Sequence, residues 1–502
     1  MHKLITLSII SLFLLTPFLG IAAPITVQQS IKNPTTPDPE WNVGHFTGQI
    51  HKTISNENGT ITGTLNLGRK STRGTFTATW TINNQSGNAK GNFTNKFIIG
   101  TLQDTPSLPF IGHLTITPCS LTILLWAPPQ GLYTIYAHYD ASFLYPPTGP
   151  YDIGVQTYHF IDESRPENFT ENDPDDLREM MVQLWYPIST NNASHQFEKY
   201  LYMDYITFQW LKGRSPIPLI TIPNHAYQYV NPYSVQNPPI ETSEGPFPVI
   251  IFSHGYDGVY QIYTSLIEDL VSHGYIIASI NHPYIAGVTV FPDNRTIPVS
   301  QIPSDPEEAE AWRTLGLRSV VEDAKYVLNT LTDWNATDPF YQGTMNLNHV
   351  GMYGHSFGGG GTAICCYEDS RFKAGLTLDG FSSSESISGG LATPFLMMVT
   401  QDRYTNDTML DLIWENLTGN AYLVGIDGSQ HYSYTDVGIL LQHLLPLVPA
   451  NLLGFGTIDQ KRMVNITITL ERAFFDVYLK QKNPDILTQA ITTYPEISYK
   501  EK

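Results

Sequence analysis

Residues 350–361 read VGMYGHSFGGGG and are followed by TAICC at residues 362–366. The first stretch contains the motif Gly-x-Ser-x-Gly, with Ser356 as its central residue. An apolar run before the motif and small, helix-compatible residues after it are typical of a strand, a sharp turn and a helix. A serine at such a turn has a strained backbone, and the flanking glycines let the helix pass close to the strand. The stretch therefore predicts that the Ser356 hydroxyl is exposed at the carboxyl edge of a sheet.

Apolar runs alternate with helical patterns from residue 248 onward. This alternation predicts a parallel sheet covered by helices on both faces, with ligands bound beyond the carboxyl ends of the strands. We expect the chain to close with a helix over about residues 466–480. The other expected elements are strands at 249–252, 275–280, 350–353, 374–378, 394–400 and 421–426, and helices at 263–272 and 307–328.

Two histidines follow Ser356, and a serine nucleophile needs a histidine or similar base to activate it. His443 lies in an apolar helical segment, which favours a structural role, whereas His431 follows the last predicted strand in a loop. We therefore assign the base to His431. The third member is a carboxylate, and Asp379 and Asp402 each end a predicted strand. Both satisfy the order serine, acid, histidine, so spacing alone leaves the two acids open.

Acyl transfer also needs backbone N–H groups that stabilise an oxyanion. We expect one from Phe357, directly after the serine, and one from Tyr256, in the turn after the strand at 249–252. His254 and His282 are interpreted as structural hydrogen-bonding residues. The sequence contains no cluster with metal-ligand spacing and no phosphate-binding glycine loop of the P-loop type, so we expect neither a metal nor another cofactor.

The chain of 502 residues is long enough for more than one domain. Residues 1–22 have a basic start, an apolar run and small residues near a plausible cleavage site, which is typical of an export signal. The proline-containing segment 23–42 suits a linker. Residues 43–139 repeat short alternating runs separated by Asn, Gly and Ser, which indicates a small antiparallel β domain. Residues 140–502 form the predicted catalytic domain.

The export signal predicts a secreted or cell-surface protein. No catalytic pattern occurs in the β domain, for which we expect a structural role or contact with a surface or a glycan. Ten Asn-x-Ser/Thr sites fit either glycosylated surface loops or chance in a chain rich in Asn and Thr. They lie at Asn58, Asn84, Asn92, Asn168, Asn192, Asn294, Asn335, Asn406, Asn416 and Asn465.

The formal net charge of −19 argues against nucleic acid as a partner and disfavours docking on anionic lipid. A neutral or zwitterionic small molecule or lipid remains compatible with it. Three cysteines do not make a disulfide framework. Cys365 and Cys366 follow the serine turn on a predicted buried helix, where cysteine behaves as a small apolar residue. The sequence leaves open whether Cys119 pairs with one of them, and it gives no indication of the oligomeric state.

Six motifs occur in a fixed order in the second part of the chain. They are GPY at 149–151, FSHG at 252–255, SHGY at 272–275, GHSFGG at 354–359, the segment 372–379 with its Leu-Asp pair, and GSQH at 428–431. Together they resemble the plasma-type (isoform II) platelet-activating factor acetylhydrolases, which are α/β-hydrolase esterases that remove short or oxidised acyl chains from phospholipids without calcium. The resemblance covers residue 148 to the end of the chain.

The resemblance implies Ser356 as nucleophile, His431 as base and Asp379 as the orienting acid, with Tyr256 and Phe357 as the oxyanion donors. Related bacterial cutinases and polyester hydrolases share the glycine-rich serine turn but place the acid one strand later, at the position of Asp402. The β domain has no counterpart in the acetylhydrolases that the motifs resemble.

The sequence therefore predicts an α/β-hydrolase fold preceded by a small antiparallel β domain. The expected activity is that of an exported serine ester hydrolase acting on a small-molecule or lipid ester. Two alternatives stay open at this point. One is an esterase of the cutinase or polyester-hydrolase type, and the other is a catalytically inactive glycoprotein that binds a surface.

Overall fold

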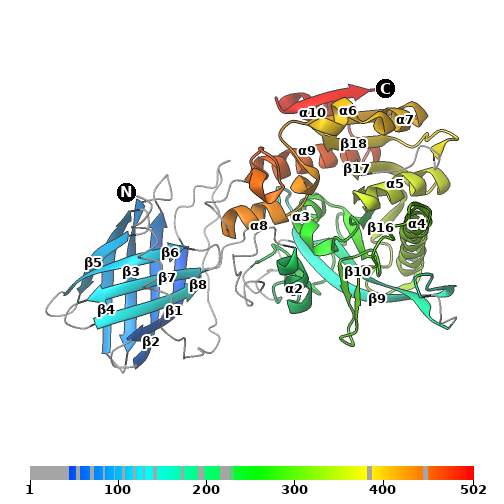
Figure 1. The fold of residues 1–502 in the computed structure, drawn as a ribbon. Helices are drawn as coiled ribbons and strands as arrows, with labels where there is room; N and C mark the ends of the chain where they lie inside the picture. The colour runs from blue at the N-terminus through cyan, green and yellow to red at the C-terminus, as the bar shows by residue number, and fades with distance from the viewer. Residues whose placement is uncertain are drawn as a thin grey trace. The chain divides into compact units, whose positions relative to one another are not determined.

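The computed structural model describes residues 44–138, with gaps between the strands, and residues 144–502 except 171–174, 190–196, 215–226, 228–229, 381–386 and 445–449. The chain divides into two compact units, Met1–Asp140 and Ala141–Lys502, which Figure 1 shows as ribbons. The predicted export signal and linker lie outside the described residues.

Eight antiparallel strands form a closed barrel in the first unit (Figure 1). They are β1 (Gly44–Lys52), β2 (Glu57–Leu67), β3 (Arg73–Ile82), β4 (Gln85–Thr94), β5 (Phe97–Gln103), β6 (Leu108–Ile116), β7 (Ser120–Ala127) and β8 (Gly131–His138). Each strand pairs with the next, and β1 also pairs with β8. On the exposed side of β3 and β4, the hydroxyl of Thr79 donates a hydrogen bond of 3.1 Å to Oδ1 of Asn88. The prediction of an antiparallel β domain is confirmed.

The second unit is built on one mixed sheet of ten strands. The central strands β13, β12, β16, β17, β18 and β19 are parallel. At the two borders of this core, β10 runs antiparallel to β13 and β20 runs antiparallel to β19, while β9 pairs antiparallel with β10 and parallel with β11. The order across the sheet is β11 (Val235–Gln236), β9 (Asp152–Pro166), β10 (Leu177–Ile188), β13 (Ile276–Asn281), β12 (Phe247–Ser253), β16 (Met345–His355), β17 (Phe372–Leu378), β18 (Phe395–Thr400), β19 (Ala421–Ile426) and β20 (Ile497–Glu501). A separate hairpin pairs β14 (Val288–Val290) with β15 (Thr296–Pro298).

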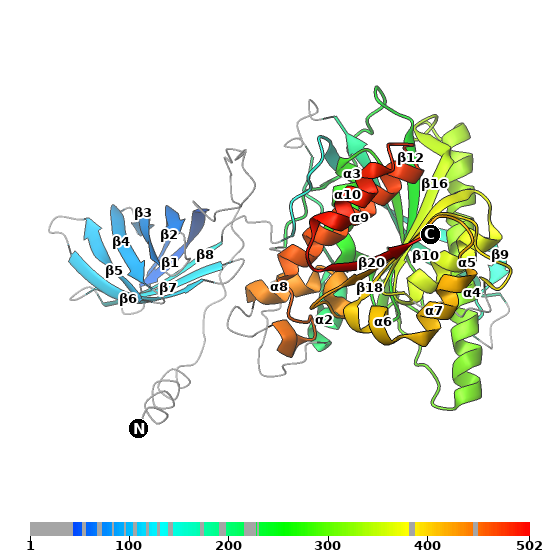
Figure 2. The same ribbon diagram turned by 90° about the horizontal axis from the view of Figure 1, so that it is seen from above.

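Helices cover both faces of this sheet, as Figure 2 shows. On one side lie α4 (Pro306–Thr337) and α5 (Phe357–Glu368), and on the other α3 (Thr264–Ser272) and α9 (Gln460–Tyr478). This arrangement confirms the predicted α/β-hydrolase fold. The remaining helices are α2 (Tyr205–Gly213), α6 (Gln401–Asn406), α7 (Thr408–Asn416), α8 (Val437–Leu444) and α10 (Asp485–Thr493), and the short 3₁₀ helices are η3 (Tyr260–Tyr263), η5 (His431–Tyr434) and η6 (Ala450–Leu453).

The start of α4 shows how local sequence defines a boundary. Asp305 precedes the helix in extended conformation, and its carboxylate accepts hydrogen bonds from the backbone N–H groups of Glu307 (3.0 Å) and Glu308 (3.1 Å). Pro306 occupies the first helical position, where its missing N–H has no intrahelical acceptor to lose. The two glutamates then place negative charge at the positive end of the helix. The long helix therefore begins at a fixed point.

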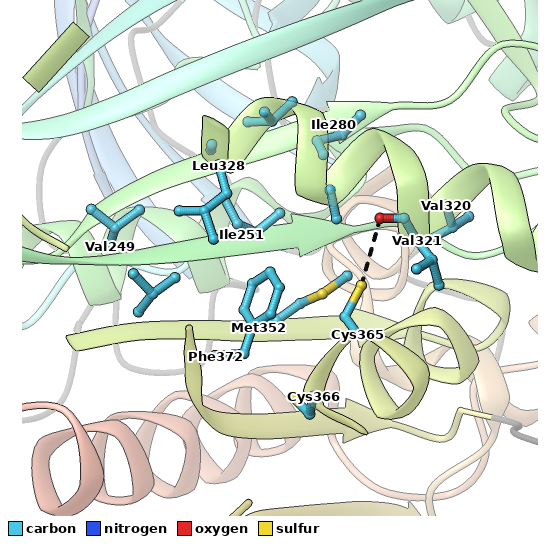
Figure 3. Close-up of a cluster of buried hydrophobic side chains, with 14 of the residues drawn as sticks. Val249, Ile251, Ile280, Val320, Val321, Leu328, Met352, Cys365, Cys366 and Phe372 are labelled. Carbon is cyan, nitrogen blue, oxygen red and sulfur yellow. Dashed lines mark hydrogen bonds between the residues drawn. The ribbon is translucent and has the colours of Figure 1, made fainter. Parts of the chain in front are cut away.

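The apolar core lies between the sheet and the helices α4 and α5 (Figure 3). The strands contribute alternate side chains to this core, such as Val249 and Ile251, and α4 contributes the apolar residues along one of its faces. Cys365 and Cys366 are free thiols inside this core, which raises the pKa of both, and Sγ of Cys365 lies 3.8 Å from the carbonyl oxygen of Val321. They fill space as small apolar residues, as expected, while Cys119 lies outside the described residues.

One expectation about the end of the chain is wrong. The helix predicted at 466–480 is α9, but the chain continues through α10 to the strand β20, which pairs antiparallel with β19. β20 has only five residues, and its register places Tyr499 opposite Val424. So short a strand, next to a helix of nine residues, gives too little periodicity to be recognised from sequence.

Two of the Asn-x-Ser/Thr sites are parts of the folded scaffold. The Asn335 side chain exchanges hydrogen bonds with both backbone groups of Met345, and Asn465 donates to the hydroxyl of Tyr145 while accepting from Tyr494. Asn294, by contrast, is exposed. Glycosylation of the chain stays a prediction, and these contacts make Asn335 and Asn465 poor acceptors. Over the described residues, every helix is too short or too polar to cross a lipid bilayer.

Candidate active site

Ser356 occupies a sharp turn between β16 and α5. Its φ of 53° and ψ of −114° are strained for a residue with a side chain. The glycines of the motif permit this turn, because a Cβ on Gly358 would lie 2.2 Å from the carbonyl oxygen of Ser253, and one on Gly354 would lie 2.4 Å from the carbonyl carbon of Gly358. The backbone N–H of Ser356 still donates to the carbonyl of Leu378 at 2.9 Å, so the sheet holds the turn in place.

His431 connects the serine to a carboxylate. Its Nε2 lies 2.8 Å from Oγ of Ser356, and its Nδ1 lies 2.6 Å from Oδ2 of Asp379. The loop that carries it starts η5, where Gln430 and Ser433 form a reciprocal capping box. The His431 side chain keeps 33% of its surface accessible, whereas Asp379 keeps 3%. The histidine can therefore meet a substrate while the acid behind it is sealed from water.

Asp379 directly follows β17 and has a positive φ of 47°. Its Oδ1 accepts hydrogen bonds from the backbone N–H of Thr400 and from Nη1 of Arg403, both at 3.2 Å. Burial raises the pKa of this carboxyl, but the hydrogen bond with His431 and the charge of Arg403 outweigh burial, so the pKa lies below its ordinary value. Asp379 is thus held as a carboxylate beside the histidine.

The second acid that spacing had left open lies elsewhere. Asp402 is in the first turn of α6, exposed to solvent, and its Oδ1 accepts a hydrogen bond of 2.8 Å from Nδ2 of Asn406. The helix that begins at Gln401 turns this side chain away from the position that Asp379 fills. The structure therefore brings Asp379, and not Asp402, to His431.

The two expected oxyanion donors are close to Ser356 in different ways: Phe357 follows it directly, and Tyr256 follows Gly255, where a Cβ would lie 3.0 Å from Cβ of Ser356. Phe357 is the first residue of α5, where backbone N–H groups have no intrahelical acceptor. The carbonyl of Gly255 accepts from Nδ1 of His254 (2.8 Å) and from the N–H of Gly258 (2.9 Å). Because a trans peptide points its C=O and N–H in opposite directions, this pairing fixes where the N–H of Tyr256 points.

His254 and His282 belong to a buried hydrogen-bonded network behind this turn. The N–H of His282 donates to Nε2 of His254 at 3.1 Å, and Nδ1 of His282 donates to Asp323 at 2.8 Å. Burial, together with the nearby imidazole of His282, lowers the pKa of His254 to about 3, and burial also lowers the pKa of His282. Both rings are therefore neutral supports of the turn, which is the structural role expected from the sequence.

Sequence reasoning missed four residues that support the site. Arg403 contacts Asp379, and Tyr263 contacts the ring of His355. Arg178 forms an ion pair with Asp323, which in turn accepts a hydrogen bond from His282. No local sequence pattern marks these residues, because each contacts a partner that is distant along the chain. His355 occupies a variable position of the serine motif, to which the sequence alone assigns no role. No group of three His, Cys, Asp or Glu side chains among the described residues is arranged to hold a metal ion.

The fold is that of an α/β-hydrolase, and a serine, a histidine and an aspartate form a hydrogen-bonded series in it. The model of the family "Platelet-activating factor acetylhydrolase, isoform II" matches residues 141–491. The chain belongs to this family, which confirms the resemblance drawn from the motifs. The match lies within the second compact unit, Ala141–Lys502.

Individual relatives agree with the family. The chain is 24% identical over 270 residues, which are 50% of its length, to a probable 1-alkyl-2-acetylglycerophosphocholine esterase of Arthroderma benhamiae, and 26% identical over 270 residues, or 48% of its length, to the platelet-activating factor acetylhydrolase of Cavia porcellus. The matched segments span 66% and 60% of those relatives. A solved ferulic acid esterase from Streptomyces cinnamoneus superposes with a TM-score of 0.59 at 25% identity, covering 71% of this chain and 98% of that one.

Proposed function

We propose that this protein is a secreted serine ester hydrolase. The observation that carries the proposal is the continuous contact from Ser356 Oγ through His431 to Asp379, with distances of 2.8 and 2.6 Å. A serine hydroxyl is a weak nucleophile near neutral pH, and a histidine within hydrogen-bond reach removes its proton as it attacks.

In the proposed reaction, Ser356 Oγ attacks the ester carbonyl while Nε2 of His431 takes the hydroxyl proton. The same nitrogen then returns this proton to the departing alcohol, which leaves an acyl group on the serine. Water then attacks the acyl-serine and gives a proton to His431, which passes it to Ser356 Oγ as the acid is released. Asp379 holds the imidazole with Nδ1–H facing it and stabilises the imidazolium that forms at each step.

The negative charge on the carbonyl oxygen is stabilised, we propose, by the N–H groups of Tyr256 and Phe357. Rigid backbone donors need no rearrangement when the charge develops, and losing one such donor typically costs about 10²–10³ in kcat. The hydrogen bonds to the carbonyl of Gly255 support this role for Tyr256, since they fix the peptide that carries its N–H.

The proposed substrates are small-molecule or lipid esters with a short acyl chain, of the kind named for the relatives in the family. A 1-alkyl-2-acetylglycerophosphocholine is zwitterionic, which suits a chain of net charge −19. A second substrate class is an ester of an aromatic acid, because the ferulic acid esterase is matched over 98% of its length. The ring of Trp312 lies 5.9 Å from that of Phe357 and 5.2 Å from that of Tyr256, which puts aromatic surface beside both proposed donors.

Export and the role of the barrel also belong to this proposal. Residues 1–22 have the composition of an export signal, and we propose that the mature protein acts outside the cell. For the barrel we propose a structural role or contact with a surface or glycan. The barrel lies outside the family match.

The experiment compares the parent protein with Ser356→Ala on p-nitrophenyl esters of increasing chain length, 1-alkyl-2-acetylglycerophosphocholine and methyl ferulate. We expect Ser356→Ala to lose a factor of about 10⁴ or more in kcat while it remains folded. A fluorophosphonate probe should label the parent and not the variant. Parent-like turnover by Ser356→Ala would refute the mechanism, and a folded parent that neither labels nor turns over any ester would favour a non-catalytic binding glycoprotein.

A further inference from the structure

The histidine inside the serine motif joins two other loops. His355 is the last residue of β16, directly before Ser356. Its Nε2 lies 2.8 Å from the backbone carbonyl oxygen of His431, and its Nδ1 lies 2.8 Å from the hydroxyl of Tyr263 in η3. The hydroxyl of Tyr263 also lies 3.4 Å from the N–H of Gly255. The rings of His355 and Tyr263 are buried, with 2% and 1% of their surfaces exposed.

Chemistry fixes the direction of each bond in this chain. A carbonyl oxygen only accepts, so Nε2 of His355 carries the hydrogen that reaches His431. Burial and the nearby imidazole of His431 lower the pKa of His355 to about 3, which leaves its ring neutral and its Nδ1 an acceptor. Tyr263 therefore donates its hydroxyl hydrogen to Nδ1, and its oxygen accepts from the N–H of Gly255.

At its other end, this series of hydrogen bonds reaches the proposed oxyanion turn through Gly255. A Cβ on Gly255 would lie 3.0 Å from both Nδ1 of His355 and Cβ of Ser356, so any larger residue here would press on both. The peptide that follows Gly255 carries the N–H of Tyr256. The carbonyl of this peptide, which belongs to Gly255, accepts hydrogen bonds from His254 and Gly258. The N–H of Gly255, in the preceding peptide, donates to the hydroxyl of Tyr263.

We propose that His355 and Tyr263 are positioning residues that hold the His431 loop and the Gly255–Tyr256 turn in register with Ser356. The inference rests on the proposed function and deepens it. The base is held through its own backbone carbonyl, and the donor turn through the N–H of the residue before the donor. His355, next to the nucleophile, takes part in both connections. One buried series of hydrogen bonds therefore sets the distance from Ser356 to its base and the distance from Ser356 to its oxyanion donor, and acyl transfer needs both.

The deciding variant is Tyr263→Phe in the full chain, which removes one oxygen and keeps the ring. We expect kcat for p-nitrophenyl acetate to fall by about 10- to 100-fold with KM changed by less than about twofold, because misplaced groups reduce the rate of the chemical step. The rate constant of fluorophosphonate labelling should fall by the same factor. Assays at a temperature well below thermal unfolding, with the folded fraction measured by circular dichroism, separate this effect from loss of folded protein.

Tyr353→Phe is the matched control. Tyr353 lies on β16 two positions before His355, its ring is buried, and within the described part of the chain its hydroxyl has no hydrogen-bond partner. Removing that hydroxyl should leave kcat and KM within about twofold of the parent, because no bond is lost.

His355 supplies a second and independent test. His355→Leu removes both bonds and should lower kcat at least as far as Tyr263→Phe, whereas His355→Gln, whose amide both donates and accepts, should restore part of the loss. The double variant Tyr263→Phe/His355→Leu should be no slower than His355→Leu alone, because the two residues act in one chain. If Tyr263→Phe unfolds at assay temperature, the comparison of His355→Gln with His355→Leu decides.

A folded Tyr263→Phe protein with the kcat and labelling rate of the parent would overturn the inference, and so would additive losses in the double variant. Failure of the proposed function is distinguishable, since it would appear as turnover by Ser356→Ala. If Ser356→Ala is inactive and Tyr263→Phe is unimpaired, the inference fails alone.

Discussion

Arg178 and Asp323 are separated by 145 positions in the chain and form a two-point ion pair, in which Nη2 of Arg178 lies 2.7 Å from Oδ2 of Asp323 and Nε lies 3.1 Å from Oδ1. Only 2% and 0% of these side chains are exposed. Asp323 also accepts from His282, which donates through its backbone to His254 behind the proposed oxyanion turn. This buried ion pair therefore supports the two histidines that hold the proposed oxyanion turn.

Arg178→Met should be strongly destabilising. The substitution keeps an unbranched apolar stem but removes the guanidinium and leaves Asp323 buried with one ion-pair partner fewer, and breaking a buried pair in this way costs about 3–5 kcal/mol. Chemical denaturation measures the change in the free energy of unfolding. Arg313→Met is the control, because its ion pair with Glu310 has 50% and 71% of the two side chains exposed and should contribute less than about 1 kcal/mol. Equal effects of the two substitutions would contradict the prediction.

The two acids that spacing left open should separate in an activity assay. Asp379→Asn removes the charge that orients His431 and should lower kcat by about 10⁴, with little change in KM. Asp402→Asn alters an exposed side chain bonded to Asn406 and should keep the parent rate. Steady-state kinetics on p-nitrophenyl acetate checks both. Collapse of activity in Asp402→Asn with near-parent activity in Asp379→Asn would reverse the assignment.

Arg403→Gln should move the acidic limb of the pH profile. The charge of Arg403 helps to keep the pKa of Asp379 below its ordinary value, so the acid stays ionised to lower pH. Without that charge Asp379 binds a proton more readily, so kcat/KM should begin to fall at a higher pH as the pH decreases. Arg371→Gln, which alters an ion pair with Asp369 away from the site, is the control and should leave the limb in place.

Glu268→Gln should change how stability depends on pH. Glu268 is buried in α3, and its Oε1 accepts from the N–H of Ser234 at 2.8 Å. Burial raises its pKa from 4.5 to about 7, so the folded protein holds a proton that the unfolded chain releases between those values. Its contribution to stability is full below about pH 4.5 and is lost as the pH rises to about 7.

The loss from this one carboxyl is on the order of 3 kcal/mol, and the neutral amide in Glu268→Gln should remove it. Unfolding free energies at pH 5 and pH 7.5 for the parent and the variant measure the difference. Glu310→Gln changes an exposed carboxyl and serves as the control. An unchanged slope of stability against pH in Glu268→Gln would show that Glu268 is ionised in the folded state.

Gly358→Ala should disrupt the serine turn itself. Its Cβ would lie 2.2 Å from the carbonyl oxygen of Ser253, a backbone atom that cannot move without shifting β12. We expect a loss of stability of about 3 kcal/mol or more together with loss of activity. Gly213→Ala, at the end of α2, meets no atom within 4 Å and should be neutral or slightly stabilising. Thermal unfolding and kinetics on the same preparations compare the two.

Sequence reasoning located the elements with strong local signals. Ser356 lies in a motif whose glycines are needed for the turn, and His431 follows the last parallel strand, so chain order and sheet geometry brought both to one edge. The choice between Asp379 and Asp402 depended on the start of α6 at Gln401, which spacing does not encode. The resemblance to a family, and not the residues alone, favoured Asp379.

Other features depend on contacts between distant parts of the chain and left no local trace. Arg403 could not be linked to Asp379 before the orientation of α6 was known, and Tyr263 read as the start of an ordinary amphipathic helix. The closure of the barrel is of the same kind, since each strand was visible but the pairing of β1 with β8 joins the two ends of the β domain. Pairing and orientation are properties of the whole fold, which periodicity does not report.

The last strand of the sheet has a consequence for the behaviour of the protein in solution. β20 is five residues long and includes Lys500 and Glu501, and it lies alongside the apolar strand β19. Brief, charged boundary strands are poor templates for intermolecular pairing. Without residues 497–501, the row of backbone groups on Ala421–Ile426 would be open to a second molecule, and the protein would become prone to fibrous aggregation.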